Sequence, residues 1–553
     1  MRPLVVGLVF AALAACGGCR SKSDADAASA PSTPQVSQAW LDGMPLPETG
    51  SPTDGGVLVV RVMSEPAGLN FLDDAFHDAW VARLTRQLVV ESLLAVDPKD
   101  FSLQPSLAEA WDERDEHHVT RFTLRAGATF STGATVTSKD VVATVAAVLD
   151  PRRATGAARG ELAGLSGCAE KGERTVECTW ATPSPAALRA LVRLPIYSAA
   201  QLAGDWSELA KAPVGSGPFV VKAWERGSAL TLERRPGGAA YLERIVFRFV
   251  KDHTVAGAMF EKGEFDVMTS IQPVLWRAME QDDPKYAWAK SYRRLRTADN
   301  SFSYIAWNEA VPAFADVRVR RALAHLYDAT LVARVVDLDL ELPTSCPFLH
   351  GSDSCEPGLG PVPFSPPAAE ALLADAGFTD SDGDGVRDRD GKPLRFTFLL
   401  PSASVRLGKL VPLLQEQLKP VGVELGIEKV ETATLSARVA KRDFEVVSRV
   451  WTEFDREHDV YPYFHSSQID GGSNFVGFSD PELDRLLDQV RGEFDVAKRR
   501  ELERAVHRRL VETQPYLFMT NRQTLDAAKA RVHGLAPSVV WYDLRQVWVD
   551  APP

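Results

Sequence analysis

The sequence has few of the residues that carry catalysis, and only one long apolar run. Its 553 residues include six cysteines and ten histidines. It contains neither a G-x-S-x-G nor an H-E-x-x-H segment, which are signatures of serine hydrolases and zinc proteases. After residue 16, no stretch is long and apolar enough to span a bilayer. We therefore expect a protein that is not an enzyme, needs no cofactor and lies outside the bilayer.

Basic residues do not outnumber acidic ones: 62 Lys and Arg stand against 74 Asp and Glu, a net charge of -12. This balance argues against nucleic acid or an anionic membrane surface as partner. The composition, 45% hydrophobic and 25% charged, is typical of globular proteins. The length predicts two or three lobes.

The N-terminus has the form of an export signal. Arg2 precedes an apolar run from Leu4 to Ala15, and Cys16 follows. "LAAC", ending at Cys16, resembles the lipobox of bacterial lipoproteins, in which the cysteine is lipidated. We predict a signal peptide over 1–15 and a lipidated flexible tether over 16–54, rich in Ser, Ala, Asp, Pro and Gly. The alternative is an ordinary secretory signal cut near Ala30.

The remaining cysteines suit an oxidising compartment. Cys168 lies near Cys178, and Cys346 near Cys355, so we predict two local disulfides, each closing a short loop. A metal site built from all four is the alternative, but these cysteines lack the two-residue spacing typical of such sites. Cys19 is left over in the tether.

Strand and helix signals alternate along the chain, which predicts an α/β fold. Residues 55–62 and 121–125 have strand patterns, and a helix is expected after Thr137 as N-cap with Asp140 in its first turn. Ser365 is expected to cap a helix that begins with Pro366, and Ser479 with Glu482 has capping-box spacing. "PVGSGPFVV" (213–221) predicts a sharp turn into a strand, because proline fixes φ and glycine frees it.

Several motifs resemble the extracytoplasmic solute-binding proteins of ABC importers, in the peptide and nickel group called family 5. They include "PSLAEAW" (105–111), "GSGPF" (215–219), "VRVRRALAHLYD" (317–328) and "FVGFSDPELDRLL" (475–487). The likeness runs from about residue 57 to about 535. The family's usual "EGL" is "ESL" at 91–93, and its usual "FHDG" is "FSTG" at 130–133, which marks a divergent member.

The resemblance implies a periplasmic-binding-protein-like fold of two lobes joined by a hinge near residues 300 and 515. An extra subdomain is inserted in the first lobe. The implied boundaries are lobe I over 55–91, 206–299 and 516–551, the inserted subdomain over 92–205, and lobe II over 300–515.

Peptide-binding relatives hold the ligand's ammonium group with an aspartate in a W-x-x-D segment. Counting from Trp451, that position holds Phe454, and Asp455 follows one residue later. Either Asp455 takes the role, or Glu453 does, or the ligand has no ammonium group. Independently of the family, segment 449–464 mixes carboxylates with aromatic rings, which can neutralise a cation and contact apolar ligand parts. The alternative is a solvated acidic loop.

Two metal sites are weighed as well. Asp380, Asp382, Asp384 and Asp388 have the spacing of a calcium loop, but Gly391 occupies the position of its bidentate glutamate. His458 and His465 could hold a metal or a metal chelate, although they have no helical i, i+4 spacing, so isolated histidines are favoured.

We therefore expect an exported, lipid-anchored receptor facing the periplasm, monomeric, that binds a small ligand and delivers it to an ABC permease in the inner membrane. An oligopeptide is the first ligand hypothesis. A metal chelate, an oligosaccharide or another cationic metabolite is the alternative, as is a sensory or interaction lipoprotein.

Overall fold

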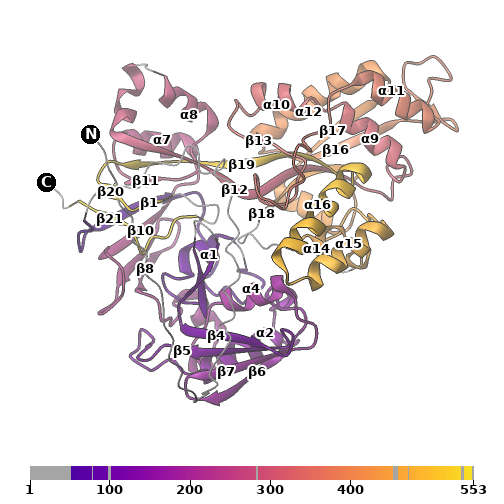
Figure 1. Ribbon diagram of the computed structural model, residues 1–553. Helices are drawn as coiled ribbons and strands as arrows, with labels where there is room; N and C mark the ends of the chain where they lie inside the picture. Colours follow the sequence, from indigo (N-terminus) through magenta and orange to yellow (C-terminus); the bar gives the residue numbers. More distant parts are fainter. Residues whose placement is uncertain are drawn as a thin grey trace, which may run out of the picture. The chain divides into compact units, whose positions relative to one another are not determined.

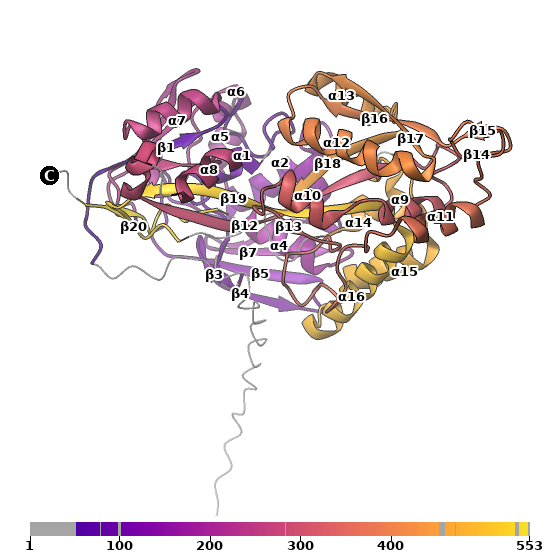
Figure 2. The same ribbon diagram turned by 90° about the horizontal axis from the view of Figure 1, so that it is seen from above.

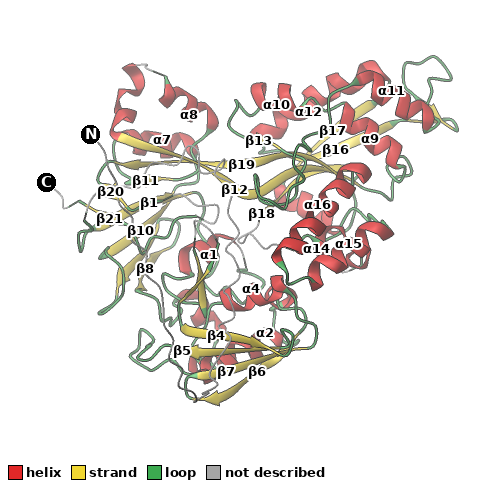
Figure 3. Ribbon diagram, viewed as in Figure 1, coloured by secondary structure: helices red, strands yellow, loops and turns green. Residues whose placement is uncertain are grey.

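The computed structural model describes residues 51–77, 79–97, 101–281, 284–452, 459–470, 472–536 and 541–550. Helices and strands alternate through these ranges (Figure 3), which confirms the expected α/β class. No helix in the described ranges combines the length and the apolar character needed to cross a membrane.

The largest sheet of the described residues has eleven strands. In spatial order these are β17 (Glu424–Val430), β16 (Arg395–Pro401), β18 (Val446–Thr452), β12 (Tyr292–Trp307), β19 (Tyr516–Lys529), β11 (Val267–Met268), β1 (Val57–Val62), β10 (Arg244–Phe249), β9 (Ala229–Arg234) and β8 (Phe219–Glu225), with β13 (Leu342–Pro343) paired to β19. The long strands β12 and β19 lie side by side and antiparallel (Figure 2). They connect strands from the first half of the chain, between residues 57 and 268, with strands from its second half, between residues 395 and 452.

A separate four-stranded antiparallel sheet comes from residues 108–180. Its order is β4 (Ala108–Arg114), β5 (Val119–Leu124), β7 (Thr175–Trp180) and β6 (Leu165–Gly172). Three two-stranded pairs complete the sheets: β2 (Leu94–Val96) with β3 (Leu103–Pro105), β14 (Asp388–Arg389) with β15 (Lys392–Pro393), and β20 (Val532–His533) with β21 (Trp548–Val549).

The helices fall along the chain as Figure 1 labels them. The α-helices are α1 (Ala79–Thr85), α2 (Ser138–Leu149), α3 (Gly156–Glu161), α4 (Pro185–Arg193), α5 (Ala199–Leu202), α6 (Trp206–Lys211), α7 (His253–Glu261), α8 (Pro273–Glu280), α9 (Val317–His325), α10 (Ala329–Val335), α11 (Pro366–Asp375), α12 (Val405–Leu418), α13 (Thr432–Ala440), α14 (Tyr461–Phe464), α15 (Pro481–Gly492) and α16 (Val496–Thr513). The 3-10 helices are η2 (Pro284–Ser291), η3 (Lys419–Val421) and η4 (Ser466–Gln468).

Two predicted helix starts are confirmed and one is wrong. The Asp140 carboxylate accepts a hydrogen bond from the Thr137 backbone N–H at 2.8 Å, and the Ser365 side chain caps α11. Helix α15 is capped by Asp480, not by Ser479, because the Asp480 carboxylate accepts from the Leu483 N–H at 2.8 Å. Pro481 then occupies the first helical position, where a missing N–H costs nothing.

The turn at "GSGPF" leads into β8 as predicted, but its glycines serve another purpose. Neither Gly215 nor Gly217 has a positive φ. A Cβ atom at Gly215 would lie 1.8 Å from the Val89 carbonyl oxygen, and one at Gly217 would lie 2.4 Å from that of Leu88. The Gly217 N–H donates to the Val89 carbonyl at 2.9 Å. Glycine is required here because two backbone segments meet with no room for a side chain.

The central strand pair is irregular where the sequence predicts a hinge. The register of β12 against β19 shifts between Ala298 and Phe302, and again between Ser303 and Tyr304. Such irregularities locally interrupt a ladder and bend a strand. The lobe boundaries inferred from the resemblance, and the movement they imply, stay predictions.

Candidate ligand-binding site

Trp451 is the one predicted ligand contact that the described residues include. It lies one residue before the end of β18, half-buried, opposite Phe302 of β12. Glu453, Phe454, Asp455 and His458 fall in 453–458, outside the described residues. The choice between Asp455 and Glu453 therefore stays a prediction, and the site is built from the residues on either side of this segment.

Trp451 belongs to a row of stacked aromatic rings. Its ring lies 4.1 Å from that of Tyr463 on α14, with 13° between the planes. The ring of Tyr304 on β12 lies 6.2 Å from that of Trp451 at 17°, and Tyr304 stacks on Tyr516 of β19 at 4.1 Å and 15°. Three strands and a short helix thus supply one aromatic row, from segments far apart in the sequence.

Tyr304 and Tyr516, the two fully buried rings of the row, carry no charge at neutral pH. Burial raises the pKa of Tyr304, and the nearby Tyr516 raises it further. Burial also raises the pKa of Tyr516. Both hydroxyls stay protonated. Because Tyr304 and Tyr516 are fully buried, they support Trp451 from the core, and a ligand can contact the row at the half-buried Trp451 and Tyr463. A charged ligand group needs its counter-charge from elsewhere, and segment 453–459 holds four carboxylates.

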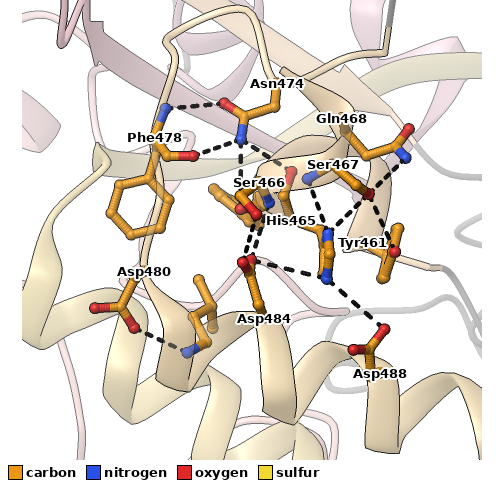
Figure 4. Close-up of polar contacts among 12 residues, drawn as sticks. Tyr461, His465, Ser466, Ser467, Gln468, Asn474, Phe478, Asp480, Asp484 and Asp488 are labelled. Atoms are coloured by element: carbon orange, nitrogen blue, oxygen red, sulfur yellow. Dashed lines mark hydrogen bonds and ion pairs between the residues drawn. The ribbon is translucent and has the colours of Figure 1, made fainter. Parts of the chain in front are cut away.

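A polar network holds the segment after α14 in place (Figure 4). The Asp484 carboxylate of α15 accepts from the Ser466 backbone N–H at 2.9 Å and from the Ser466 hydroxyl. The Asn474 side-chain amide donates to the His465 and Phe478 carbonyls at 3.1 and 2.8 Å. Because these bonds join α14 and η4 to α15, they fix the helix that carries Tyr463.

Asp459 and His465, which the sequence places near the acidic segment, have structural partners. Asp459 pairs with Arg491 at 2.7 Å, and the Arg491 guanidinium lies 3.8 Å from the centre of the Tyr461 ring. His465 stacks on Tyr461 at 4.0 Å, and its Nε2 faces Asp484 and Asp488 at 3.9 and 3.7 Å. Both side chains therefore join the chain around α14 to α15, and a metal or chelate at His465 stays an alternative.

The predicted calcium loop gathers three of its four aspartates. Oxygens of Asp380, Asp382 and Asp384 lie within 4.8 Å of one another, and all three residues are exposed. Asp388 instead accepts from the Ser381 N–H and hydroxyl at 3.0 and 2.7 Å. Backbone N–H groups inside the loop already occupy Asp380 and Asp384. Calcium binding stays a prediction, and these bonds would compete with it.

Both predicted disulfides are present. Cys168 and Cys178 face each other across β6 and β7, and Cys346 and Cys355 close a loop, with the sulfurs at bonding distance in each pair. His507 of α16 fastens the second loop just outside its disulfide. Its Nε2 lies 2.9 Å from the Ser345 hydroxyl, and its Nδ1 accepts from the Glu356 N–H at 2.9 Å.

Tyr304 and Tyr516 are the residues of the row that the sequence did not point to. Each lies in a stretch of strand in which the adjacent residues are also buried, so nothing local separates it from an ordinary core residue. Tertiary structure identifies them: β12 pairs with β18 so that Phe302 lies opposite Trp451 and Tyr304 lies two residues further along β12.

Comparison with known proteins places the chain among binding proteins. Residues 102–472 match a family model described as "Bacterial extracellular solute-binding proteins, family 5 Middle". The chain is 27% identical over 500 residues to "Oligopeptide-binding protein AppA" of Bacillus subtilis, covering 85% of this chain and 87% of that protein. It is 24% identical over 324 residues to "Nickel-binding periplasmic protein" of Escherichia coli, covering 56% and 59%.

Solved structures share the fold. The Bacillus subtilis oligopeptide-binding protein AppA, in complex with a nonapeptide, superposes with a TM-score of 0.76 at 25% identity, covering 91% of this chain and all of that chain. NikA from Brucella suis, in complex with Fe(III)-EDTA, gives a TM-score of 0.78 at 20% identity and covers 90% and 100%. These likenesses confirm the expected fold class, the periplasmic-binding-protein-like α/β fold.

Proposed function

The chain belongs to the bacterial extracellular solute-binding proteins of family 5, and from this premise we propose that it binds an oligopeptide beside the Trp451 row. The protein then delivers the peptide to an ABC permease. Cys16 carries the lipid that tethers the receptor to the cell envelope. Neither step involves catalysis, because the receptor only captures and releases its ligand.

The observation that carries the proposal is the row of rings next to an acidic segment. Trp451 and Tyr463 stack at 4.1 Å, and the chain between them contains Glu453, Asp455 and Glu457. Carboxylates beside aromatic faces can neutralise an ammonium group while the rings contact apolar parts of a ligand. A peptide with a free N-terminus has both features, and an oligosaccharide has no cation.

Hinge closure supplies the mechanism of the receptor. A ligand that contacts both lobes stabilises the closed state by its differential contacts, and the permease recognises that state. We place the bend in β12 and β19, near Ala298 and Phe302, because the register shifts already interrupt the ladder there.

The ammonium contact is tested with pairs of peptides that differ only at the N-terminus. Calorimetry should detect binding of the free peptide and at least about tenfold weaker binding of its N-acetyl form, since a buried charge-assisted hydrogen bond is lost. Asp455→Asn should remove this difference if Asp455 holds the ammonium group, and Glu453→Gln should remove it if Glu453 does. Equal binding of the two peptide forms to the unmodified protein would contradict the ammonium contact.

A metal chelate is the second candidate, because one relative is a nickel-binding periplasmic protein and NikA from Brucella suis has been solved with Fe(III)-EDTA. The complex of nickel with free histidine is the probe for this second candidate. Tight binding of the chelate together with no binding of peptides would replace the oligopeptide by a chelate. Binding of neither, with no transporter dependence in cells, would favour a sensory lipoprotein.

A further inference from the structure

A cavity of about 140 Å³ lies beside the C-terminal ends of α1 and α4, two helices that Figure 1 shows close together. The rest of its wall comes from β2 and from residues 541–545. None of the residues of the Trp451 row lines it. The cavity is therefore separate from the candidate ligand-binding site.

Most of the wall is apolar. Leu88, Leu94, Trp541 and Leu544 line the cavity, and each is less than a tenth exposed. A cavity of roughly 150 Å³ with apolar walls is known to bind benzene. The volume and the wall therefore suit an apolar body about the size of a six-membered ring.

The polar part of the wall is strongly cationic. Three arginines line the cavity, Arg86, Arg193 and Arg545, against one carboxylate, Asp543. Asp543 accepts two hydrogen bonds from Arg545, both at 2.8 Å, so these two charges balance each other. Arg86 and Arg193, from separate elements, bring two further positive charges to the lining, and Glu161 outside the lining offsets part of them.

The other two arginines are held in place from behind. The Arg86 guanidinium lies 4.7 Å from the centre of the Phe71 ring, and the Arg193 Nε donates to the Arg189 carbonyl at 3.1 Å. Arg86 and Arg193 both help to lower the pKa of the Glu161 carboxyl. Glu161 is not part of the cavity wall, and it pairs with His77 at 3.3 Å. Each guanidinium has five N–H donors, so it can keep these contacts and still bind a further anion.

The wall also includes strained backbone. Trp541 has a φ of 92° and Gln87 a φ of 65°, a region that side-chain-bearing residues rarely adopt. Such conformations persist only where the surrounding structure enforces them, and they concentrate at ligand sites.

We propose that this cavity binds a small monocarboxylate with an apolar body the size of one six-membered ring. The carboxylate lies against Arg86 and Arg193, because the planar guanidinium matches a carboxylate in shape and charge. The ring lies against Leu94 and Trp541. The site does not depend on the ligand of the Trp451 row, and it can be occupied with or without it.

Benzoate and benzamide are the probes, because they share a ring and differ in charge. Titration calorimetry on the purified protein should show benzoate binding at one site, and benzamide binding at least about tenfold more weakly. Absence of binding heat with benzoate at about 10 mM would overturn the proposal, because a dissociation constant above that concentration is too weak for a specific site. Equal affinity for the two probes would overturn the role of the arginines.

Four variants locate the binding. Arg193→Gln should weaken benzoate about tenfold or more, and Arg152→Gln, a change of the same kind at an exposed arginine, should not. Ala95→Leu fills the cavity without changing its charge and should abolish binding even if Arg193→Gln folds poorly. Trp451→Ala should leave benzoate affinity unchanged. Loss in Trp451→Ala, or full affinity in Ala95→Leu with an unchanged melting temperature, would place benzoate elsewhere and overturn the proposal.

Discussion

Trp451 stacks on Tyr463, with 4.1 Å between the ring centres and 13° between the ring planes. Trp451 lies one residue before the end of β18, and Tyr463 lies in α14, the next helix. Segment 453–458, which contains three carboxylates, lies between them in the chain. The stack therefore brings the two ends of that segment together, beside the buried Tyr304. This relationship is the basis of the proposed ligand site.

Trp451→Ala should weaken peptide binding by about tenfold or more, because large aromatic side chains dominate binding energies where they form a pocket wall. Trp451→Phe keeps a ring that can stack on Tyr463, so it should lose much less peptide affinity. Calorimetry with a peptide that the unmodified protein binds measures both effects.

Trp224→Ala is the matched control for that series, since Trp224 lies on β8, at the opposite end of the sheet from the strands around β18. The peptide affinity of Trp224→Ala should equal that of the unmodified protein. A Trp451→Ala protein that folds normally and binds peptide with full affinity would remove Trp451 from the site.

Replacing both Cys346 and Cys355 by serine should lower the free energy of unfolding by about 2–3 kcal/mol, the entropy of closing a loop of this length in the unfolded chain. Urea unfolding under oxidising conditions measures the loss. The double serine variant at Cys168 and Cys178 is the comparison, because there the β6–β7 hairpin already holds the ends together. An unchanged midpoint in the Cys346 and Cys355 variant would show that the disulfide constrains nothing.

His507 should make the stability of the protein fall in acid. Burial lowers the pKa of His507 to about 4, below the 6.5 of an unfolded histidine, and its Nδ1 is engaged as an acceptor by the Glu356 N–H. Between these values the unfolded chain binds more protons than the folded one, so stability is present above about pH 6.5 and is lost as the pH falls towards 4.

The measurement is the urea midpoint from pH 7 to pH 4 for the unmodified protein and for His507→Gln. The variant removes this titration, so its stability should depend less on pH in that window. His325→Gln, at a histidine near the surface of α9, should keep the full dependence. Parallel curves for the unmodified protein and His507→Gln would contradict the assignment.

Calcium at about 0.1 mM should leave the melting temperature unchanged, because the loop lacks the bidentate glutamate and its aspartates accept hydrogen bonds from backbone N–H groups. Thermal unfolding with calcium or with a chelator tests this. A clear rise that disappears in Asp382→Asn would show instead that the three exposed aspartates bind the ion at that concentration.

Local patterns in the sequence predicted most of the fold. Val319, Ala322 and Leu323 share the buried face of α9, because helical spacing alone puts apolar residues on one side. The cap of α15 was misplaced by one residue because serine and aspartate are both good caps, and only the proline position separates them. The reason for Gly215 was also missed, because the crowding comes from Val89, far away in sequence.

The site was predictable only in part. Trp451 stands beside acidic and aromatic neighbours in the sequence itself. Tyr304 and Tyr516 join it through strand pairing across large separations, which no local pattern encodes. The link from His507 to Ser345 and Glu356 has the same origin, since it depends on where α16 packs.

Native mass spectrometry of the gently purified protein tests the central claim most directly. If the protein encloses oligopeptides beside the Trp451 row, the spectrum should show a series of bound masses that fragment into short peptides. That series should be depleted in Trp451→Ala. A single bound mass that is not a peptide, retained in that variant, would contradict the account of both the ligand and its site.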